Sequence, residues 1–216
     1  VWDANTGKTA LTYTGATARV RALVWSPDGK RIASAQEGST TPTDRAIVQV
    51  WDAATGRALL TYSGHTGPVE AVAWSPNGRW IASGGQDATV RVWDAMTGQT
   101  LYTYHQRYVA RVAWSPDSKW IASSDGEANV HVWDALSGRT IFTHTQATNA
   151  YQIAMSWAPD SQRLALCGYD DGLVQIWNVT TGARVLTYTV HKATEVFLHL
   201  AEQGLPAVVV NTVVWA

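Results

Sequence analysis

Three residues of the 216-residue chain, His65, Ser83 and Asp87, have the side chains of a serine hydrolase triad. In such a site the histidine takes the proton of the serine hydroxyl, and the carboxylate orients the histidine. That chemistry needs an exposed serine and donors for an oxyanion, and in one large class of hydrolases the serine lies in a Gly-x-Ser-x-Gly turn. No such turn occurs in the sequence. The three residues alone therefore do not predict a hydrolase.

Other residues that bind ligands show no spacing typical of a site. Neither the six histidines nor the single cysteine shows the close spacing of zinc ligands. The glycines do not form a phosphate-binding loop. The histidines other than His65 are His105, His131, His144, His191 and His199, and the cysteine is Cys167. We expect no metal and no cofactor.

Composition excludes several classes of partner. The net charge is −1 and only 15% of residues are charged, so no strong field attracts nucleic acid or an acidic membrane. The most apolar stretch, residues 205–216, is about half the ~20 residues that a membrane helix needs. One cysteine cannot form an internal disulfide, which fits a reducing compartment such as the cytoplasm. We expect no nucleic-acid partner and no membrane contact.

The dominant pattern is a repeat whose units end on Trp-Asp or a variant of it. Successive tryptophans of this repeat are separated by 49, 42, 40, 44 and 38 residues. A period of about 40–45 residues indicates an array of equal structural units. The tryptophans are Trp2, Trp51, Trp93, Trp133, Trp177 and Trp215. Residues that recur with this period are best explained by the architecture.

One unit predicts four short antiparallel strands, at residues 69–74, 80–83, 89–93 and 99–104. Each is rich in β-branched and aromatic residues or in alternating polar and apolar ones. The first turn contains Pro76 followed by Asn77-Gly78, residues that favour a tight turn. No run has the spacing of a helix. A small sheet of this kind is not stable alone, so the units must stack. The sequence predicts an all-β protein.

The repeated residues resemble those of the WD-repeat β-propeller family, over essentially the whole chain. Besides Trp-Asp, the resemblance rests on turns such as Ser26-Pro27-Asp28-Gly29, on a Thr-Gly or Ser-Gly pair after each Trp-Asp, and on Gly64-His65. It implies four-stranded antiparallel blades around a central channel, with strands a to d ordered from the inside outward. The repeats look like those of bacterial members.

The resemblance implies a single, incomplete propeller over residues 1–216. Complete blades are expected at about residues 19–63, 68–104, 108–145 and 150–189. Residues 1–14 would supply strands c and d of another blade, and residues 195–216 strands a to c of a further one. Because known propellers of the family usually have seven blades, we expect a piece of a larger ring. Pairing of the strand near Tyr13 with the 195–215 sheet would instead give five blades.

The resemblance also assigns a role to the histidine, serine and aspartate. In this family His65, Ser83, Asp87 and Trp93 correspond to a structural tetrad, joined in series by hydrogen bonds. Other units hold degenerate versions: His105, Ser123, Glu127 and Trp133; Cys167, Asp171 and Trp177; and Ser34 and Trp51 with Ala16 in the histidine position.

The resemblance places a partner-binding surface on the loops that join strands d to a and b to c. Residues there differ between blades, as a specific surface on a repetitive scaffold would; ordinary surface drift would also produce such variation. The candidates are Arg19, Arg21, Pro68, Glu70, Gln86, Tyr108, Ala110 and Asp170. An insertion at residues 37–45 lies in one of the b–c turns.

The function implied is a non-catalytic scaffold that binds a protein or peptide partner. An alternative is the regulatory or sensor propeller of a multidomain signalling enzyme, such as a protein kinase or a nucleotide-switch ATPase. A kinase or P-loop motif in adjoining sequence would favour that alternative. A propeller hydrolase is less well supported, because no exposed triad can be assigned.

Overall fold

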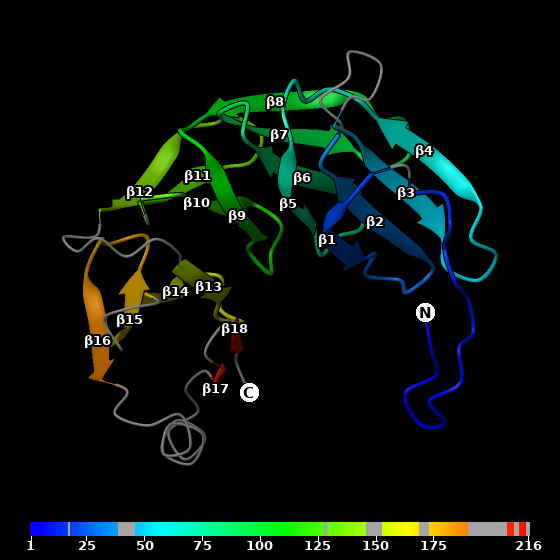
Figure 1. Cartoon of the computed structure of the whole chain (residues 1–216). Coiled ribbons are helices and arrows are strands. Elements are labelled where there is room, and N and C mark those ends of the chain that lie inside the picture. The colour runs from blue at the N-terminus through cyan, green and yellow to red at the C-terminus, as the bar shows by residue number, and fades with distance from the viewer. Residues whose placement is uncertain are drawn as a thin grey trace. The chain divides into compact units, whose positions relative to one another are not determined.

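The computed structural model describes residues 1–16, 18–38, 46–127, 129–145, 153–168, 173–189, 207–209 and 212–214. These residues form eighteen short strands, and no helix occurs among them (Figure 1). The chain divides into two compact units, Val1–Val109 and Ala110–Ala216, and each is described by itself.

Unit 1 contains two antiparallel sheets, here named blades 1 and 2. Blade 1 consists of β1 (Val20–Trp25), β2 (Arg31–Gln36), β3 (Val48–Asp52) and β4 (Ala58–Tyr62). Blade 2 consists of β5 (Val69–Trp74), β6 (Trp80–Gly85), β7 (Thr89–Asp94) and β8 (Thr100–His105). Before them, the N-terminal segment folds back on itself, with one β-bridge between Trp2 and Thr9.

Unit 2 contains blades 3 and 4 and a two-stranded sheet. Blade 3 consists of β9 (Val109–Trp114), β10 (Trp120–Asp125), β11 (Val130–Asp134) and β12 (Thr140–His144). Blade 4 consists of β13 (Ile153–Trp157), β14 (Arg163–Gly168), β15 (Leu173–Asn178) and β16 (Arg184–Thr189). β17 (Ala207–Val209) pairs with β18 (Thr212–Val214). The predicted fold class is confirmed: all-β, with four complete four-stranded antiparallel blades. Residues 195–206, expected to begin the further partial blade, lie outside the described residues.

The aspartate of each Trp-Asp pair organises the turn that follows it. Asp94 Oδ1 accepts hydrogen bonds from the backbone N–H groups of Met96 and Thr97, both at 2.9 Å, and from the Thr97 hydroxyl at 3.2 Å. Gly98, at a φ of 72°, then completes the turn between β7 and β8. A short acceptor side chain followed by a residue at positive φ is a favourable turn sequence. The Trp-Asp pair therefore recurs because it ends one strand and its aspartate forms the turn that leads into the next strand.

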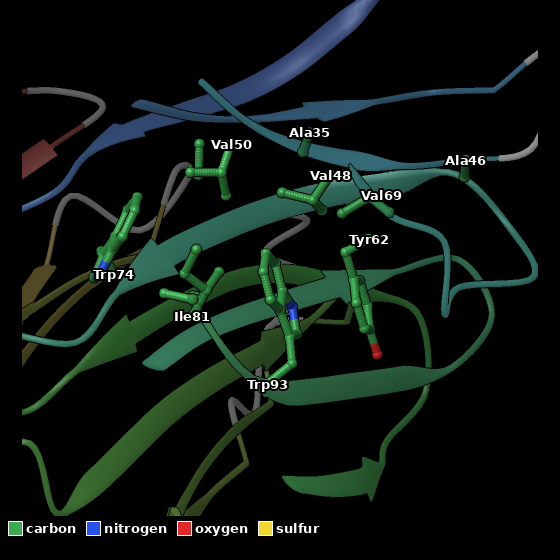
Figure 2. Close-up of a cluster of buried hydrophobic side chains, with 11 residues drawn as sticks. Ala35, Ala46, Val48, Val50, Tyr62, Val69, Trp74, Ile81 and Trp93 are labelled. Atoms are coloured by element: carbon green, nitrogen blue, oxygen red, sulfur yellow. The ribbon is translucent and has the colours of Figure 1, made fainter. Parts of the chain in front are cut away.

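Blades 1 and 2 share a core. The inner strands β1 and β2 lie against β5, and the cluster includes Val48 and Val50 from blade 1 with Val69, Trp74 and Trp93 from blade 2. Figure 2 shows these side chains between the two sheets, with the rings of Tyr62 and Trp93 face to face. The ring centroids are 4.5 Å apart and the planes differ by 5°. Aromatic stacking adds about 0.5–1.5 kcal/mol to the burial of area.

Backbone geometry makes one position in blade 2 a site for a stabilising substitution. Ala88 has a φ of 59°, which costs a residue with a β-carbon about 1–2 kcal/mol. We expect Ala88→Gly to raise the free energy of unfolding by about 0.5–1 kcal/mol, measured by urea unfolding. Gly78→Ala is the matched reverse change, because Gly78 has a φ of 75° and a β-carbon there would meet nothing within 4 Å. Destabilisation by Ala88→Gly would show that the alanine conformation is not strained.

Candidate functional site

The four predicted tetrad residues of blade 2 lie in one series of hydrogen bonds. The Trp93 indole N–H donates to Ser83 Oγ at 3.1 Å, and His65 Nε2 lies 2.8 Å from the same oxygen. His65 Nδ1 lies 2.9 Å from Asp87 Oδ2. The series joins β7 and β6 to the loop before β5 and to the turn after β6. Ser83 and Trp93 are fully buried, so the serine hydroxyl is not placed to attack a substrate.

The Asp87 carboxylate is held in its charged form. It also accepts the backbone N–H of Thr66 at 3.0 Å and the Thr89 hydroxyl at 2.8 Å. Burial raises the pKa of Asp87, but the hydrogen bond and charge of His65, with the bonds from Thr89 and Thr66, lower it well below its ordinary value of 3.8. Arg91 Nε lies 4.0 Å away. Opposite charge and donated hydrogen bonds favour the ionised form.

Blade 1 replaces the tetrad by a glutamine pair. Trp51 Nε1 still donates to Ser34 Oγ, at 3.3 Å. Gln36 stands in the position of Gly85, where an added β-carbon would lie 3.4 Å from His65 Nδ1 and 3.5 Å from Asp87 Oδ1. The Gln36 side chain is fully buried and donates to Gln49 Oε1 at 3.0 Å. Gln36 therefore occupies the position that in blade 2 lies beside His65 and Asp87. Ala16, which stands in the histidine position of blade 1, has no polar side chain to contribute.

Blade 3 keeps the tryptophan–serine contact of the tetrad. Trp133 Nε1 donates to Ser123 Oγ at 3.1 Å. His105, assigned to the histidine position, lies exposed at the end of β8 and pairs with Thr89. Asp125 is buried and accepts the backbone N–H groups of Glu127 and Asn129, each at 2.9 Å. The acid that organises this turn is Asp125, whereas Glu127 contributes its backbone.

In blade 4 the strand register places the serine position one residue before Cys167. Leu166 pairs with Gln175, as Ser83 pairs with Arg91, so Leu166 corresponds to Ser83 and Cys167 to Gly84. Trp177 Nε1 donates to Gln175 Oε1 at 3.2 Å. The sequence contained the signal, because Leu166 directly follows Ala165 as Ser83 follows Ala82. Asp171 lies outside the described residues.

Charged residues of the predicted partner surface form a network across blades 1 and 2. Arg21 Nη2 lies 2.7 Å from Glu37 Oε1, and Arg21 Nε donates to Glu37 Oε2 at 3.1 Å. Arg21 Nη1 also lies 3.9 Å from Glu70 Oε2. Gln86 Nε2 donates to Glu70 Oε1 at 2.7 Å. We name Glu37, Arg21, Glu70 and Gln86 the Arg21 network. Glu37 was expected only as the first residue of an insertion.

The network stabilises the charges of Arg21 and Glu37. The hydrogen bond from Arg21 holds the pKa of Glu37 below its usual range, against the opposing effect of burial. The hydrogen bond to Glu37, followed by the charge of Glu70, raises the pKa of Arg21. The side chain of Arg21 is 29% exposed, that of Glu37 is 31% exposed and that of Glu70 is 11% exposed. Arg21 and Glu37 are therefore charged, held by each other and partly exposed.

The other candidates for this surface are placed less closely together. Arg19 is exposed, and its backbone carbonyl accepts the Glu37 N–H at 2.9 Å. The Pro68 carbonyl accepts the Gln86 N–H at 2.9 Å. Tyr108 is exposed and its phenol interacts electrostatically with Arg21. Ala110 belongs to unit 2 and is described apart from the network. Asp170 lies outside the described residues.

No three His, Cys, Asp or Glu side chains among the described residues are grouped so as to hold a metal ion. Nor does this part of the chain contain a helix long and apolar enough to cross a membrane.

The tetrad, the Trp-Asp turns and the stacked blades agree with a family model. The model described as "WD domain, G-beta repeat" matches residues 7–52, 56–94, 98–134 and 138–178. The chain belongs to the WD-repeat family. Proteins of this family generally serve as scaffolds for protein interactions and are typically not enzymes. The four matches run from one outer strand to the next Trp-Asp or Trp-Asn, so each contains parts of two blades.

A solved structure shows the same fold. This WD-repeat chain is similar to the structure of U3-55K, with a TM-score of 0.71 and 23% sequence identity over 83% of this chain and 54% of that one. At that identity the likeness concerns the fold alone. This chain spans about half the length of that one. No curated protein sequence matches the chain.

Proposed function

We propose that this WD-repeat chain binds a protein or peptide partner through the surface that contains the Arg21 network. The observation that supports the proposal is the network itself, which crosses from blade 1 to blade 2. Its residues differ between repeats, whereas the tetrad and turn residues serve the fold.

The network has the properties of a recognition surface. Its side chains are already held in place by hydrogen bonds and charge, so a partner would lose little entropy in ordering them. Arg19 adds an exposed positive charge beside Glu37, and Tyr108 adds an exposed aromatic ring. Charged groups fix the orientation and specificity of a partner, and tyrosine and arginine are common residues of strong binding sites.

Charge reversal tests the proposal. With the whole chain as bait, Arg21→Glu and Glu70→Arg are each expected to reduce the amount of specifically captured partner at least about tenfold, measured by quantitative mass spectrometry. Lys119→Glu is the matched control, because Lys119 is 72% exposed and forms a similar surface ion pair with Asp117. Melting curves of all three variants must match the parent chain. Equal capture by the parent chain and both network variants would refute this surface.

A further inference from the structure

Met96 is exposed because of the turn in which it lies, between β7 and β8. Its side chain is 72% exposed. In each of the five described turns that follow a Trp-Asp or Trp-Asn pair, the side chain of the Asp or Asn accepts the N–H of the residue two positions further on, and that residue is exposed. The residues at this position are Asn5, Ala54, Met96, Leu136 and Thr180. Blade 2 therefore presents a thioether to solvent at a position that none of the described repeats buries.

The Met96 sulfur lies against a cation that belongs to blade 1. Arg31 Nη1 donates to Met96 Sδ at 2.7 Å. The Arg31 guanidinium also lies over the Trp74 ring, 4.9 Å from its centroid, and its Nη2 lies 3.8 Å from Asp28 Oδ2. The Arg31 side chain is 18% exposed, so its neighbours hold it in place. A thioether is a weak acceptor, and a strong donor is therefore held beside a sulfur that accepts poorly.

We propose that Met96 is a site of reversible oxidation by hydroperoxides, and that Arg31 binds the product, methionine sulfoxide. The sulfur lone pair attacks one oxygen of hydrogen peroxide, and the O–O bond breaks as the S–O bond forms. The proton of the transferred oxygen moves to the departing hydroxide, which leaves as water. The sulfur is oxidised and the peroxide is reduced, so no other reactant is needed.

Oxidation of Met96 strengthens the contact between blades 1 and 2. The sulfoxide oxygen is polar, and a hydrogen bond that it accepts from a guanidinium is assisted by charge. Arg31 begins β2 and Met96 follows β7, so this bond joins the two blades. At a buried methionine the added oxygen would instead disturb packing. The other methionine of the chain, Met155, is partly buried and packs against a hydrophobic cluster of unit 2, so it serves as an internal comparison.

The first experiment measures which methionine is oxidised. The whole 216-residue chain is treated with dilute hydrogen peroxide and digested with trypsin, which separates Met96, in residues 92–107, from Met155, in residues 140–163. Mass spectrometry is expected to show sulfoxide at Met96 forming at least about tenfold faster than at Met155, because susceptibility follows exposure. Equal rates would overturn the assignment of Met96 as the site.

The second experiment measures whether Arg31 binds the sulfoxide. Oxidation is expected to raise the melting temperature of the parent chain by about 2–4 °C, the shift that corresponds to about 1 kcal/mol in a chain of this size. Methionine sulfoxide reductases for both epimers should return it to its starting value. Met96→Leu is the matched control, because it contains the same Cys167 and Met155 and so reports oxidation elsewhere; peroxide should leave its melting temperature unchanged.

Arg31→Leu tests the donor, by comparison of its own oxidised and reduced forms. The rise in melting temperature should be absent from this variant, although Met96 is still oxidised. An equal rise in Arg31→Leu, or no rise in the parent chain, would overturn the role of Arg31. Arg31 begins β2 and Glu37 follows its other end, so the Arg21 network is not involved and either proposal can fail alone.

Discussion

Replacing Trp93 by alanine is expected to lower the free energy of unfolding by about 3–5 kcal/mol. The indole is fully buried, stacks on Tyr62 and donates to Ser83. Its removal would leave a large cavity between two blades and would take a hydrogen bond from a buried hydroxyl. Urea unfolding followed by circular dichroism measures the loss.

Trp2→Ala is the matched control for this prediction, because Trp2 and Trp93 are each the centre of a copy of the Val-Trp-Asp motif. Trp2 is 75% exposed, so its removal should change the free energy of unfolding by no more than about 0.5 kcal/mol. Equal losses for the two variants would mean that the motif itself, and not its burial between blades, determines stability.

The contrast between these tryptophans shows how much of the fold the sequence could predict. The period of Trp-Asp predicted four four-stranded antiparallel blades, which the structure has, since each period repeats the same strand and turn residues. Strand ends were less well predicted: residues 80–83 were expected as a strand, and β6 continues to Gly85. The Trp-Asp motif does not determine whether its tryptophan is exposed, because the burial of that side chain depends on whether a neighbouring sheet is present.

The tetrad was predictable only where every residue is present. In blade 2 the four side chains meet as the family pattern implies. In blade 1 the family pattern indicates no histidine and gives no reason to expect Gln36, whose burial and hydrogen bond to Gln49 arise only in the folded sheet. In blade 4 the position was misread by one residue, because a cysteine resembles serine more than Leu166 does. Strand pairing, which fixes the register, corrected both.

The remaining large effect concerns the buried pair of His65 and Asp87. His65→Ala is expected to lower the free energy of unfolding by about 2–3 kcal/mol, because it removes a partner from Ser83 and the principal partner from a buried carboxylate. The loss stays below that of a wholly unpaired charge, since Thr66 and Thr89 still donate to Asp87. His105→Ala, at an exposed histidine of the same blade, should change it by no more than about 0.5 kcal/mol.

The pH dependence of stability tests the charge of Asp87 independently. Its pKa is lower in the folded protein than its ordinary value of 3.8, so folding favours the ionised form. The resulting stabilisation is fully present above that value and is lost as the pH falls below about 4. The difference in unfolding free energy between the parent chain and Asp87→Asn should therefore shrink as the pH falls below about 4. A difference that grew as the pH fell would show that Asp87 is preferentially protonated in the folded blade, as a carboxyl group dominated by burial would be.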